Sequence, residues 1–232
     1  MTTDTVAETV PAGPVSARNN GGRHVLQQSS SRREQMLLFA KNFIKHPMML
    51  GSLIPSSRFL IRQLLSPIDW ASTDLVVEYG PGVGTITTEV LARMHSDARM
   101  IVIETNEDFV DFLRRTVDDP RLEVIHGSAA DVAEYLREFG YERADYVISG
   151  IPFSTMPANV RDAIVQATHD ALKPDGAFLV YQFSPSVGRH LERIFGHIER
   201  SGEMRNVPPA RLFFCTPHPQ QRSGAEAASN TA

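Results

Sequence analysis

The chain has 232 residues, of which 42% are hydrophobic, so it is long enough to bury one sizeable core. Its 23 basic and 27 acidic side chains give a net charge of -4, which argues against a protein whose main partner is a nucleic-acid backbone. Its one cysteine, Cys215, excludes an internal disulfide framework and a multi-cysteine metal site, and it suits a reducing compartment.

The two ends of the chain differ in composition from the middle. Residues 1–31 and 219–232 are rich in small and polar residues and lack any hydrophobic period, so we expect both to be disordered tails. The first ten residues lack a basic leader, and no later run approaches the roughly 18 apolar residues of a spanning helix. We therefore expect a cytoplasmic protein, with residues 32–66 forming a helix and a cap segment and residues 67–218 forming one domain.

The segment from Arg32 to His46 has the pattern of an amphipathic helix. Its apolar stripe is Met36, Phe39, Ala40 and Phe43, and its flanking cations are Arg33, Lys41 and Lys45. Four cations against Glu34 give this stretch a local charge of +3. These features predict a helix lying in an anionic lipid interface, at the inner face of the cell membrane. The alternative is a lid packed over a binding site, and one helix could do both.

Apolar runs typical of strands then alternate with helical patterns. The runs are Leu75–Tyr79, Met100–Ile103, Leu122–Ile125, Tyr146–Ile148 and Ala177–Phe183. One of the helices, Pro157–Leu172, is followed by a predicted turn at Lys173–Gly176. Such alternation predicts an α/β fold: a Rossmann-like, doubly wound parallel sheet with helices on both faces. Two final strands, His197–Asn206 and Arg211–Thr216, predict a C-terminal antiparallel hairpin at the sheet edge.

The strongest local signal is the glycine-rich turn after the first strand, Glu78-Tyr79-Gly80-Pro81-Gly82-Val83-Gly84. Such a turn lets a ligand approach the backbone at the carboxyl edge of the sheet. The dinucleotide pattern G-x-G-x-x-G fails, because its last position is Thr85 or Thr87. A phosphate-binding loop also fails, because no Lys-Ser/Thr pair follows.

Two carboxylates near this turn indicate the charge of the ligand. Glu104 ends the second strand, 20 residues beyond Gly84, where it could accept both hydroxyls of a ribose. The alternative for Glu104 is a solvated charge. Glu78 would repel a pyrophosphate and favour a cation. We therefore predict S-adenosylmethionine, which carries a sulfonium and no phosphate and leaves as S-adenosylhomocysteine, as the cofactor.

The motif E-x-G-x-G-x-G, the acidic end of the second strand and a hydrophobic-Pro-aromatic turn after the fourth resemble class I S-adenosylmethionine-dependent methyltransferases. More narrowly, the chain resembles bacterial phospholipid N-methyltransferases that act on phosphatidylethanolamine. This resemblance spans residues 36–216, and its motifs are Gly51-Ser52-Leu53-Ile54-Pro55-Ser56-Ser57, Ser149-Gly150-Ile151-Pro152-Phe153-Ser154 and Asn206-Val207-Pro208-Pro209-Ala210.

The resemblance implies a set of cofactor-binding residues. Glu78 would hold the methionine end with Gly80, Pro81, Gly82 and Gly84. Glu104 would bind the ribose, and Ser128 and Ala129 the adenine edge. Thr105 and Ser149 are further cofactor-binding candidates. Many relatives place Asp at the adenine contact, so Ser128 or Asp131 must take that role here.

The turn after the fourth strand bears on the acceptor. Related RNA adenine dimethyltransferases have Asn-Leu-Pro-Tyr where this chain has Gly150-Ile151-Pro152-Phe153. Those enzymes draw out the delocalised lone pair of an aryl amine with an amide oxygen and a backbone carbonyl, and Gly150 has no side chain to do so. We infer that the acceptor nitrogen is aliphatic. The alternative is that these four residues form only a strand-to-helix turn.

Further residues are candidates for the substrate. Tyr181, at the end of the fifth strand, would orient the amine or relay its proton, and Phe153 and Phe183 could face an ammonium. The alternative for each of these aromatic residues is plain core packing. Arg189, His190, Arg205 and Arg211 are candidates for a lipid phosphate, although any of them could be a solvated surface charge.

These observations predict an enzyme that transfers methyl groups to the headgroup amine of phosphatidylethanolamine at the membrane surface, with repeated transfer to phosphatidylcholine as a further expectation. The expected partners are a phospholipid and an anionic membrane, with no nucleic acid and no metal. Two alternatives remain open: an RNA adenine-N6 methyltransferase, and a membrane-associated regulator that binds the cofactor without catalysis.

Overall fold

The computed structural model describes residues 58–184, 187–203 and 210–217. The predicted tails, the helix at 32–46 with Arg33, Lys41 and Lys45, and the candidate Arg205 all lie outside the described residues.

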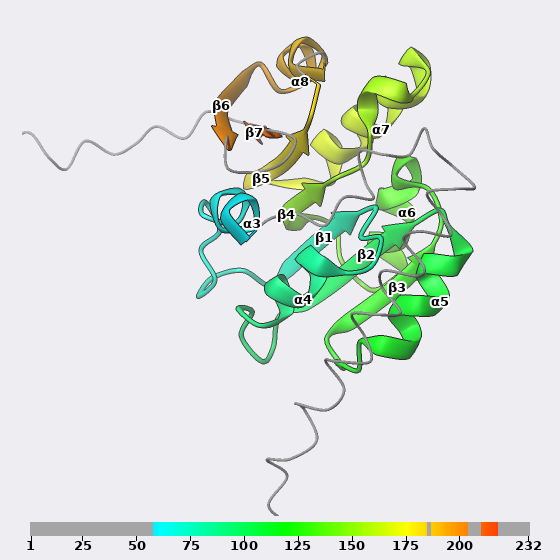
Figure 1. Cartoon of the computed structure of the whole chain (residues 1–232). Coiled ribbons are helices and arrows are strands. Elements are labelled where there is room, and N and C mark those ends of the chain that lie inside the picture. The colour runs from blue at the N-terminus through cyan, green and yellow to red at the C-terminus, as the bar shows by residue number, and fades with distance from the viewer. Residues whose placement is uncertain (1–57, 185–186, 204–209, 218–232) are drawn as a thin grey trace, which may run out of the picture.

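One seven-stranded sheet organises the described part of the chain (Figure 1). Its strands follow the order β3-β2-β1-β4-β5-β7-β6. Strands β1 to β5 are mutually parallel, whereas β7 is antiparallel to both of its neighbours. The predicted Rossmann-like sheet with a C-terminal antiparallel hairpin is thereby confirmed. The strands are β1 Leu75–Tyr79, β2 Arg99–Glu104, β3 Leu122–His126, β4 Ala144–Ser149, β5 Leu172–Gln182, β6 His197–Glu203 and β7 Ala210–Thr216.

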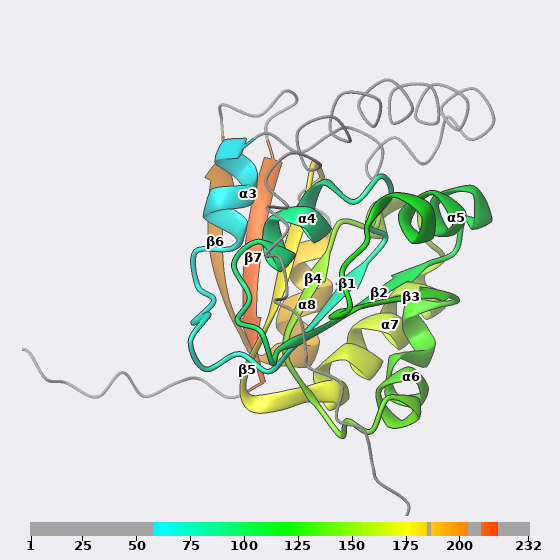
Figure 2. The same ribbon diagram turned by 90° about the horizontal axis from the view of Figure 1, so that it is seen from below.

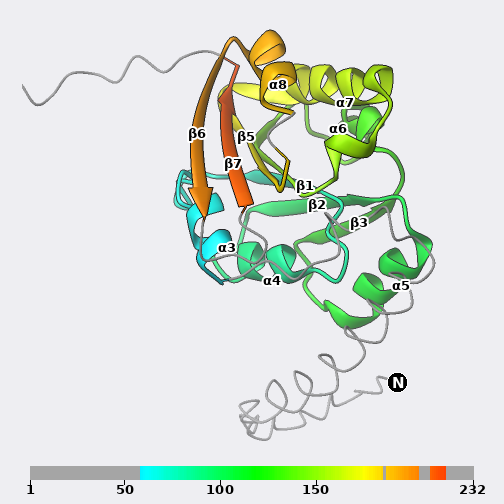
Figure 3. The same ribbon diagram turned by 45° about the horizontal axis from the view of Figure 1, so that its top comes forward.

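Helices cover both faces of the sheet, as Figure 3 shows. One layer contains α3 (Arg58–Leu64), α4 (Thr85–Leu91) and α5 (Glu107–Thr116), and the other contains α6 (Val132–Glu138), α7 (Ala158–Ala171) and α8 (Gly188–Phe195). Two short 3-10 helices, Ala129–Asp131 and Phe153–Thr155, precede α6 and α7. Strands β1, β2 and β4 and the second half of β5, residues 177–182, have helices on both sides, and most of their residues are buried.

Alternate side chains of the central strands enter two separate cores. Val77 and Tyr79 of β1 pack toward α6, α7 and α8, whereas Val76 packs toward α3 and α4. All three are fully buried. Burial of each such aliphatic side chain contributes roughly 1.5–3 kcal/mol, which fixes the register of β1 and therefore the place where its glycine turn emerges.

Strand β5 begins earlier than the sequence indicated. The prediction placed a turn at Lys173–Gly176, but β5 starts at Leu172 and passes through this segment with a shift in register against β4. The Lys173 ammonium lies 2.6 Å from the Asp145 carboxylate of β4, and an ideal Cβ on Gly176 would lie 2.6 Å from the Asp145 carbonyl oxygen. The prediction of a turn is wrong because these contacts keep the segment extended alongside β4.

The terminal hairpin packs beside helix α3 (Figure 2). The side-chain amide of Gln63 in α3 donates a hydrogen bond of 2.6 Å to the Ser201 hydroxyl in β6. The hairpin is therefore held at both its paired edge, along β5, and its helical side.

Candidate active site

The turn from Gly80 to Gly84 joins β1 to α4 at the carboxyl edge of the sheet. Gly80, Gly82 and Gly84 have φ angles of 65°, 56° and 78°, a left-handed region that favours glycine. Space is limiting as well, since an ideal Cβ on Gly80 would lie 2.6 Å from Ile151 and one on Gly84 would lie 2.6 Å from Leu113. Both the conformation and the close packing therefore require glycine at these positions.

Glu78 lies beneath this turn and is 3% exposed. The Thr87 hydroxyl donates a hydrogen bond of 2.6 Å to its carboxylate. Burial raises the pKa of Glu78 to about 7, with the charge of Glu104 acting in the same direction and the Thr87 hydrogen bond opposing it. A positive group bound nearby would favour the ionised form of this carboxylate.

Glu104 ends β2 and is held by three backbone N–H donors. Thr105 N and Asn106 N donate to one oxygen over 2.8 and 2.9 Å, and Gly82 N donates to the other over 3.2 Å. Burial raises the pKa of Glu104 even though these hydrogen bonds oppose the shift. The carboxylate is therefore fixed against the glycine turn.

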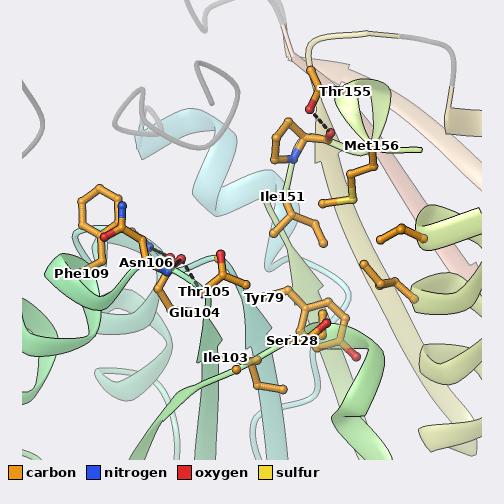
Figure 4. Close-up of a pocket in the computed structure, with 17 residues that line it drawn as sticks. Tyr79, Ile103, Glu104, Thr105, Asn106, Phe109, Ser128, Ile151, Thr155 and Met156 are labelled. Carbon is orange, nitrogen blue, oxygen red and sulfur yellow. Dashed lines mark hydrogen bonds between the residues drawn. The ribbon is translucent and has the colours of Figure 1, made fainter. Parts of the chain in front are cut away.

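A pocket of about 280 Å³ opens over the ends of these strands. Figure 4 shows Glu104, Thr105 and Asn106 on one side of it and Ile151, Thr155 and Met156 on the other. The complete lining is Tyr79, Gly80, Gly82, Ile103, Glu104, Thr105, Asn106, Phe109, Gly127, Ser128, Ala129, Ile151, Pro152, Thr155, Met156, Val160 and Ile164. The pocket is thus elongated across the ends of β3, β2, β1 and β4, and it combines apolar walls with one fixed carboxylate.

The predicted cofactor residues fall into two groups. Gly80, Gly82, Glu104, Thr105, Ser128 and Ala129 line the pocket together, whereas Pro81, Gly84 and Glu78 support it from the turn. Ser128 lines the pocket and Asp131 does not, so Ser128 is the better placed of the two adenine candidates. Ser149 is fully buried, and its hydroxyl has no hydrogen-bond partner among the described residues.

The residues after β4 separate into pocket and core. Ile151 and Pro152 line the pocket. The Phe153 ring is fully buried and packs edge-on against Phe178 with a centroid distance of 6.3 Å, so it belongs to the core and does not face a substrate. Phe183 is half-buried and packs against the core beneath α3 and α4. Neither ring is part of the pocket wall, so both lie in the core packing that the sequence analysis gave as their alternative.

Gln182 is a polar residue at this edge that the sequence analysis missed. Its side-chain amide donates to the Ile151 carbonyl oxygen over 2.7 Å and to the Tyr181 carbonyl oxygen over 2.9 Å. The Ile151 oxygen also accepts a hydrogen bond of 2.9 Å from Phe153 N, so two donors occupy it. In the sequence, Gln182 could have been noticed as a polar amide at the end of an otherwise apolar strand.

The candidate phosphate residues do not converge on the pocket. Arg189 and Arg211 are exposed on α8 and β7. The His190 ring lies 3.3 Å from the Asp162 carboxylate, which also pairs with Arg193 over 2.6 Å. None of these cations lines the pocket in the described residues, so their assignment to a substrate phosphate gains no geometric support.

Two structural features are absent from the described residues. No helix there is long and apolar enough to cross a membrane. No group of three or more His, Cys, Asp and Glu side chains there gathers in a way that could hold a metal ion.

The residues of the site fit the predicted cofactor. The left-handed glycines leave backbone in reach of a ligand, and two buried carboxylates favour positive charge over phosphate. The fold and the site together define a class I S-adenosylmethionine-dependent methyltransferase.

Comparison with known proteins agrees with this class. Residues 51–206 match the model of the methyltransferase small domain, and the chain belongs to this family. The chain is 35% identical over 184 residues to an ornithine lipid N-methyltransferase of Singulisphaera acidiphila, a match that covers 78% of this chain and 96% of that relative.

More distant likenesses concern parts of the chain or the fold alone. The ribosomal RNA small subunit methyltransferase A of Mycoplasma mycoides subsp. mycoides is 29% identical over 96 residues, which cover 40% of this chain and 35% of that relative. The structure of human methyltransferase-like protein 13 in complex with SAH superposes with a TM-score of 0.52 at 17% identity, covering 76% of this chain and 83% of the human one.

Proposed function

We propose that this enzyme methylates the primary alkyl amine of a membrane lipid headgroup. Phosphatidylethanolamine, with repeated transfer to phosphatidylcholine, is the first candidate substrate, and an ornithine lipid is the second. Ethanolamine and ornithine both carry a primary alkyl amine, so one acceptor site could serve either headgroup. The similarity to an ornithine lipid N-methyltransferase over almost the whole length of that relative supports a lipid substrate.

The residues proposed to hold the methyl donor are those around the glycine turn. Glu104 and Thr105 would bind its ribose, Ser128 and Ala129 its adenine, and Glu78 would favour its positive charge from below. When bound, S-adenosylmethionine supplies a methyl group on a positively charged sulfur, which leaves with its electron pair. The protein's part is to align the acceptor nitrogen and keep water out.

The observation that carries the choice of amine is the state of the acceptors after β4. An aryl amine, whose lone pair is delocalised, needs hydrogen-bond acceptors to localise that pair. Gly150 offers no side chain, and the Ile151 carbonyl oxygen already accepts from Gln182 and Phe153. An alkyl amine has a localised lone pair and needs only to lose a proton from a group whose pKa in water is about 10. Desolvation in the apolar part of the pocket would lower that pKa.

The experiment is transfer of labelled methyl groups from S-adenosylmethionine to defined vesicles. Phosphatidylglycerol vesicles would contain phosphatidylethanolamine, ornithine lipid or neither, and thin-layer analysis would separate the lipids. We expect label in one or both amine-bearing lipids and none in phosphatidylglycerol. Label in added RNA or protein, with both lipids unlabelled, would contradict the proposal.

The two alternatives make different predictions in the same assay. An RNA adenine-N6 methyltransferase would label RNA, although the net charge of -4 and the match to only 35% of an RNA enzyme's length count against it. A regulator without catalysis would bind S-adenosylmethionine in calorimetry and label no amine.

A further inference from the structure

Tyr181 and Gly150 form an unusually close pair on neighbouring strands. An ideal Cβ built on Gly150 would lie 2.2 Å from the Tyr181 hydroxyl oxygen and 2.5 Å from the ring carbon that bears it. Even an alanine at position 150 would therefore require the phenol to move. The end of the tyrosine side chain occupies the volume in which a side chain at position 150 would begin.

The glycine is needed here for space and not for backbone conformation. Gly150 is absent from the glycines with positive φ among the described residues, which are Gly80, Gly82, Gly84, Gly140 and Gly196. Its backbone is therefore accessible to any residue, and its N–H donates to the Tyr79 carbonyl oxygen as an extension of the β1–β4 pairing. Only the phenol of Tyr181 accounts for the absence of a side chain.

Neither Gly150 nor Tyr181 lines the pocket, but the residue that follows each of them contacts its wall. Ile151, which follows Gly150 directly, lines the pocket and packs against Gly80 of the glycine turn. Gln182, which follows Tyr181 directly, holds the Ile151 carbonyl oxygen. Tyr181 thus contacts Gly150, and Gln182 contacts Ile151. Tyr181 is only 5% exposed and packs in the core, and its hydroxyl lies where a side chain of Gly150, the residue after β4, would begin.

We propose that the Tyr181 hydroxyl positions the acceptor amine, and that Gly150 is a specificity-determining residue because it makes room for that hydroxyl. This inference rests on the proposed function. The hydroxyl oxygen accepts a hydrogen bond from an N–H of the neutral amine, which leaves the nitrogen lone pair directed away from Tyr181 and toward the methyl group. The phenol takes the place of a polar side chain at position 150, and it suits a tetrahedral alkyl amine because it supplies one acceptor.

The first test is the variant Tyr181→Phe, which keeps the ring against Gly150 and removes only the hydroxyl. We expect kcat for the amine-bearing lipid to fall about 10- to 100-fold, the scale on which loss of alignment slows a reaction. The affinity for S-adenosylmethionine and the melting temperature should stay close to those of the wild type. The matched control is Tyr146→Phe, since Tyr146 lies on the same face of neighbouring strand β4 and its hydroxyl donates to the Pro67 carbonyl oxygen, far from the pocket lining. This control should keep wild-type kcat.

The second test is Gly150→Ala, which forces the phenol out of its position. We expect the same loss of kcat, with retained binding of S-adenosylmethionine in calorimetry as evidence that the fold survives. Wild-type kcat in either Tyr181→Phe or Gly150→Ala would overturn the inference, as would an equal loss in Tyr146→Phe. An active wild-type enzyme with an unaffected Tyr181→Phe variant contradicts this inference alone. A wild-type enzyme that labels neither lipid contradicts the proposed function, and the inference falls with it.

Discussion

Glu78 and Glu104 are two buried carboxylates that meet the same glycine turn from different strands. Thr87 donates to the first, and three backbone N–H groups donate to the second. Among the described residues, no basic side chain donates a hydrogen bond to either carboxylate. A cationic ligand bound between them would stabilise their ionised forms. The affinity for that ligand and its dependence on pH should therefore change when either residue is replaced.

The variant Glu104→Ala should weaken S-adenosylmethionine binding by about 1–3 kcal/mol, because the ribose would lose a charged hydrogen-bond acceptor. Isothermal calorimetry measures this change. The matched control is Glu107→Ala, an exposed carboxylate in the first turn of α5 that does not line the pocket. Unchanged affinity in Glu104→Ala would remove this residue from the cofactor site.

Glu78 predicts how stability depends on pH. Its pKa is about 7 in the folded protein and near 4.5 when the chain is unfolded, so the folded state binds more protons between these values. The free energy of unfolding of the ligand-free protein should therefore fall as pH rises from about 4.5 to about 7. Thermal melting of Glu78→Gln should show a smaller decrease than the wild type, since Glu104, whose pKa burial also raises, keeps its own contribution. The variant should have a higher melting temperature than the wild type at pH 8.

The same carboxylate should make cofactor affinity depend on pH. Ionised Glu78 favours a positive ligand, so S-adenosylmethionine should bind the wild-type protein more tightly at pH 8 than at pH 6. Calorimetry in buffers of different ionisation enthalpy should also detect release of a proton on binding at pH 6.5. A pH-independent affinity equal in the wild type and Glu78→Gln would contradict this role.

Sequence reasoning predicted correctly which residues meet at the pocket where their position in the fold follows from their place along the chain. The glycine turn and Glu104 could be found because they end consecutive parallel strands, whose carboxyl ends must share one edge. The Gly150–Tyr181 contact and the Gln182 amide bonds could not be found in this way, because they depend on the register between β4 and β5. For Phe153 the sequence left core packing and a ring facing a ligand both open, because the two have the same sequence pattern, and the structure places the ring in the core.

At the scale of elements, one guanidinium connects the amino-terminal edge of the sheet to a helix end. Arg121, just before β3, donates to the carbonyl oxygens of Leu91, Met94 and His95 at the end of α4, over 2.7, 2.9 and 3.2 Å. It also pairs with Asp119, which lowers the pKa of that carboxyl through the hydrogen bond from Arg121. A charged side chain thus satisfies carbonyl groups that a helix end leaves without partners.

Replacing Arg121 by Ala should lower the free energy of unfolding by about 1–3 kcal/mol, because several hydrogen bonds to a charged group are lost together. Urea denaturation measures this loss. The control Arg114→Ala removes a guanidinium that donates to one carbonyl oxygen, that of Val124, and should cost less. Equal stability of the Arg121 variant and the wild type would show that water replaces these bonds without penalty.

For the whole molecule, the overall fold followed from the alternation of apolar runs and amphipathic segments, because helices must cover both faces of a parallel sheet. The antiparallel pairing of β6 and β7 was predictable from the proline-rich link between two strand patterns. The extended start of β5 was not, because a Lys-Pro-Asp-Gly sequence favours a turn, and the contacts with Asp145 that oppose it join residues far apart in the sequence.

The proposed attachment to membranes concerns the segment at 32–46, which lies outside the described residues. Reversing two of its cations with Lys41→Glu and Lys45→Glu should abolish sedimentation with anionic vesicles, since its charge would change from +3 to -1. The control pair Glu89→Gln and Arg93→Gln removes a half-buried ion pair between α4 and the residues just after it, without changing the net charge. Undiminished sedimentation of the Lys41/Lys45 variant would reject the interfacial helix.

Ile151, just after β4, packs against Gly80, the first glycine of the turn after β1. The methyl carbon Cγ2 of Ile151 would lie 2.6 Å from a Cβ built on Gly80, so the places proposed for the methyl donor and for the lipid amine share a wall. Enlarging Gly80 or reshaping Ile151 therefore cannot be confined to one reactant. In such variants the Michaelis constants for the methyl donor and for the lipid should change together, whereas variants at Ser128 should change that of the donor alone.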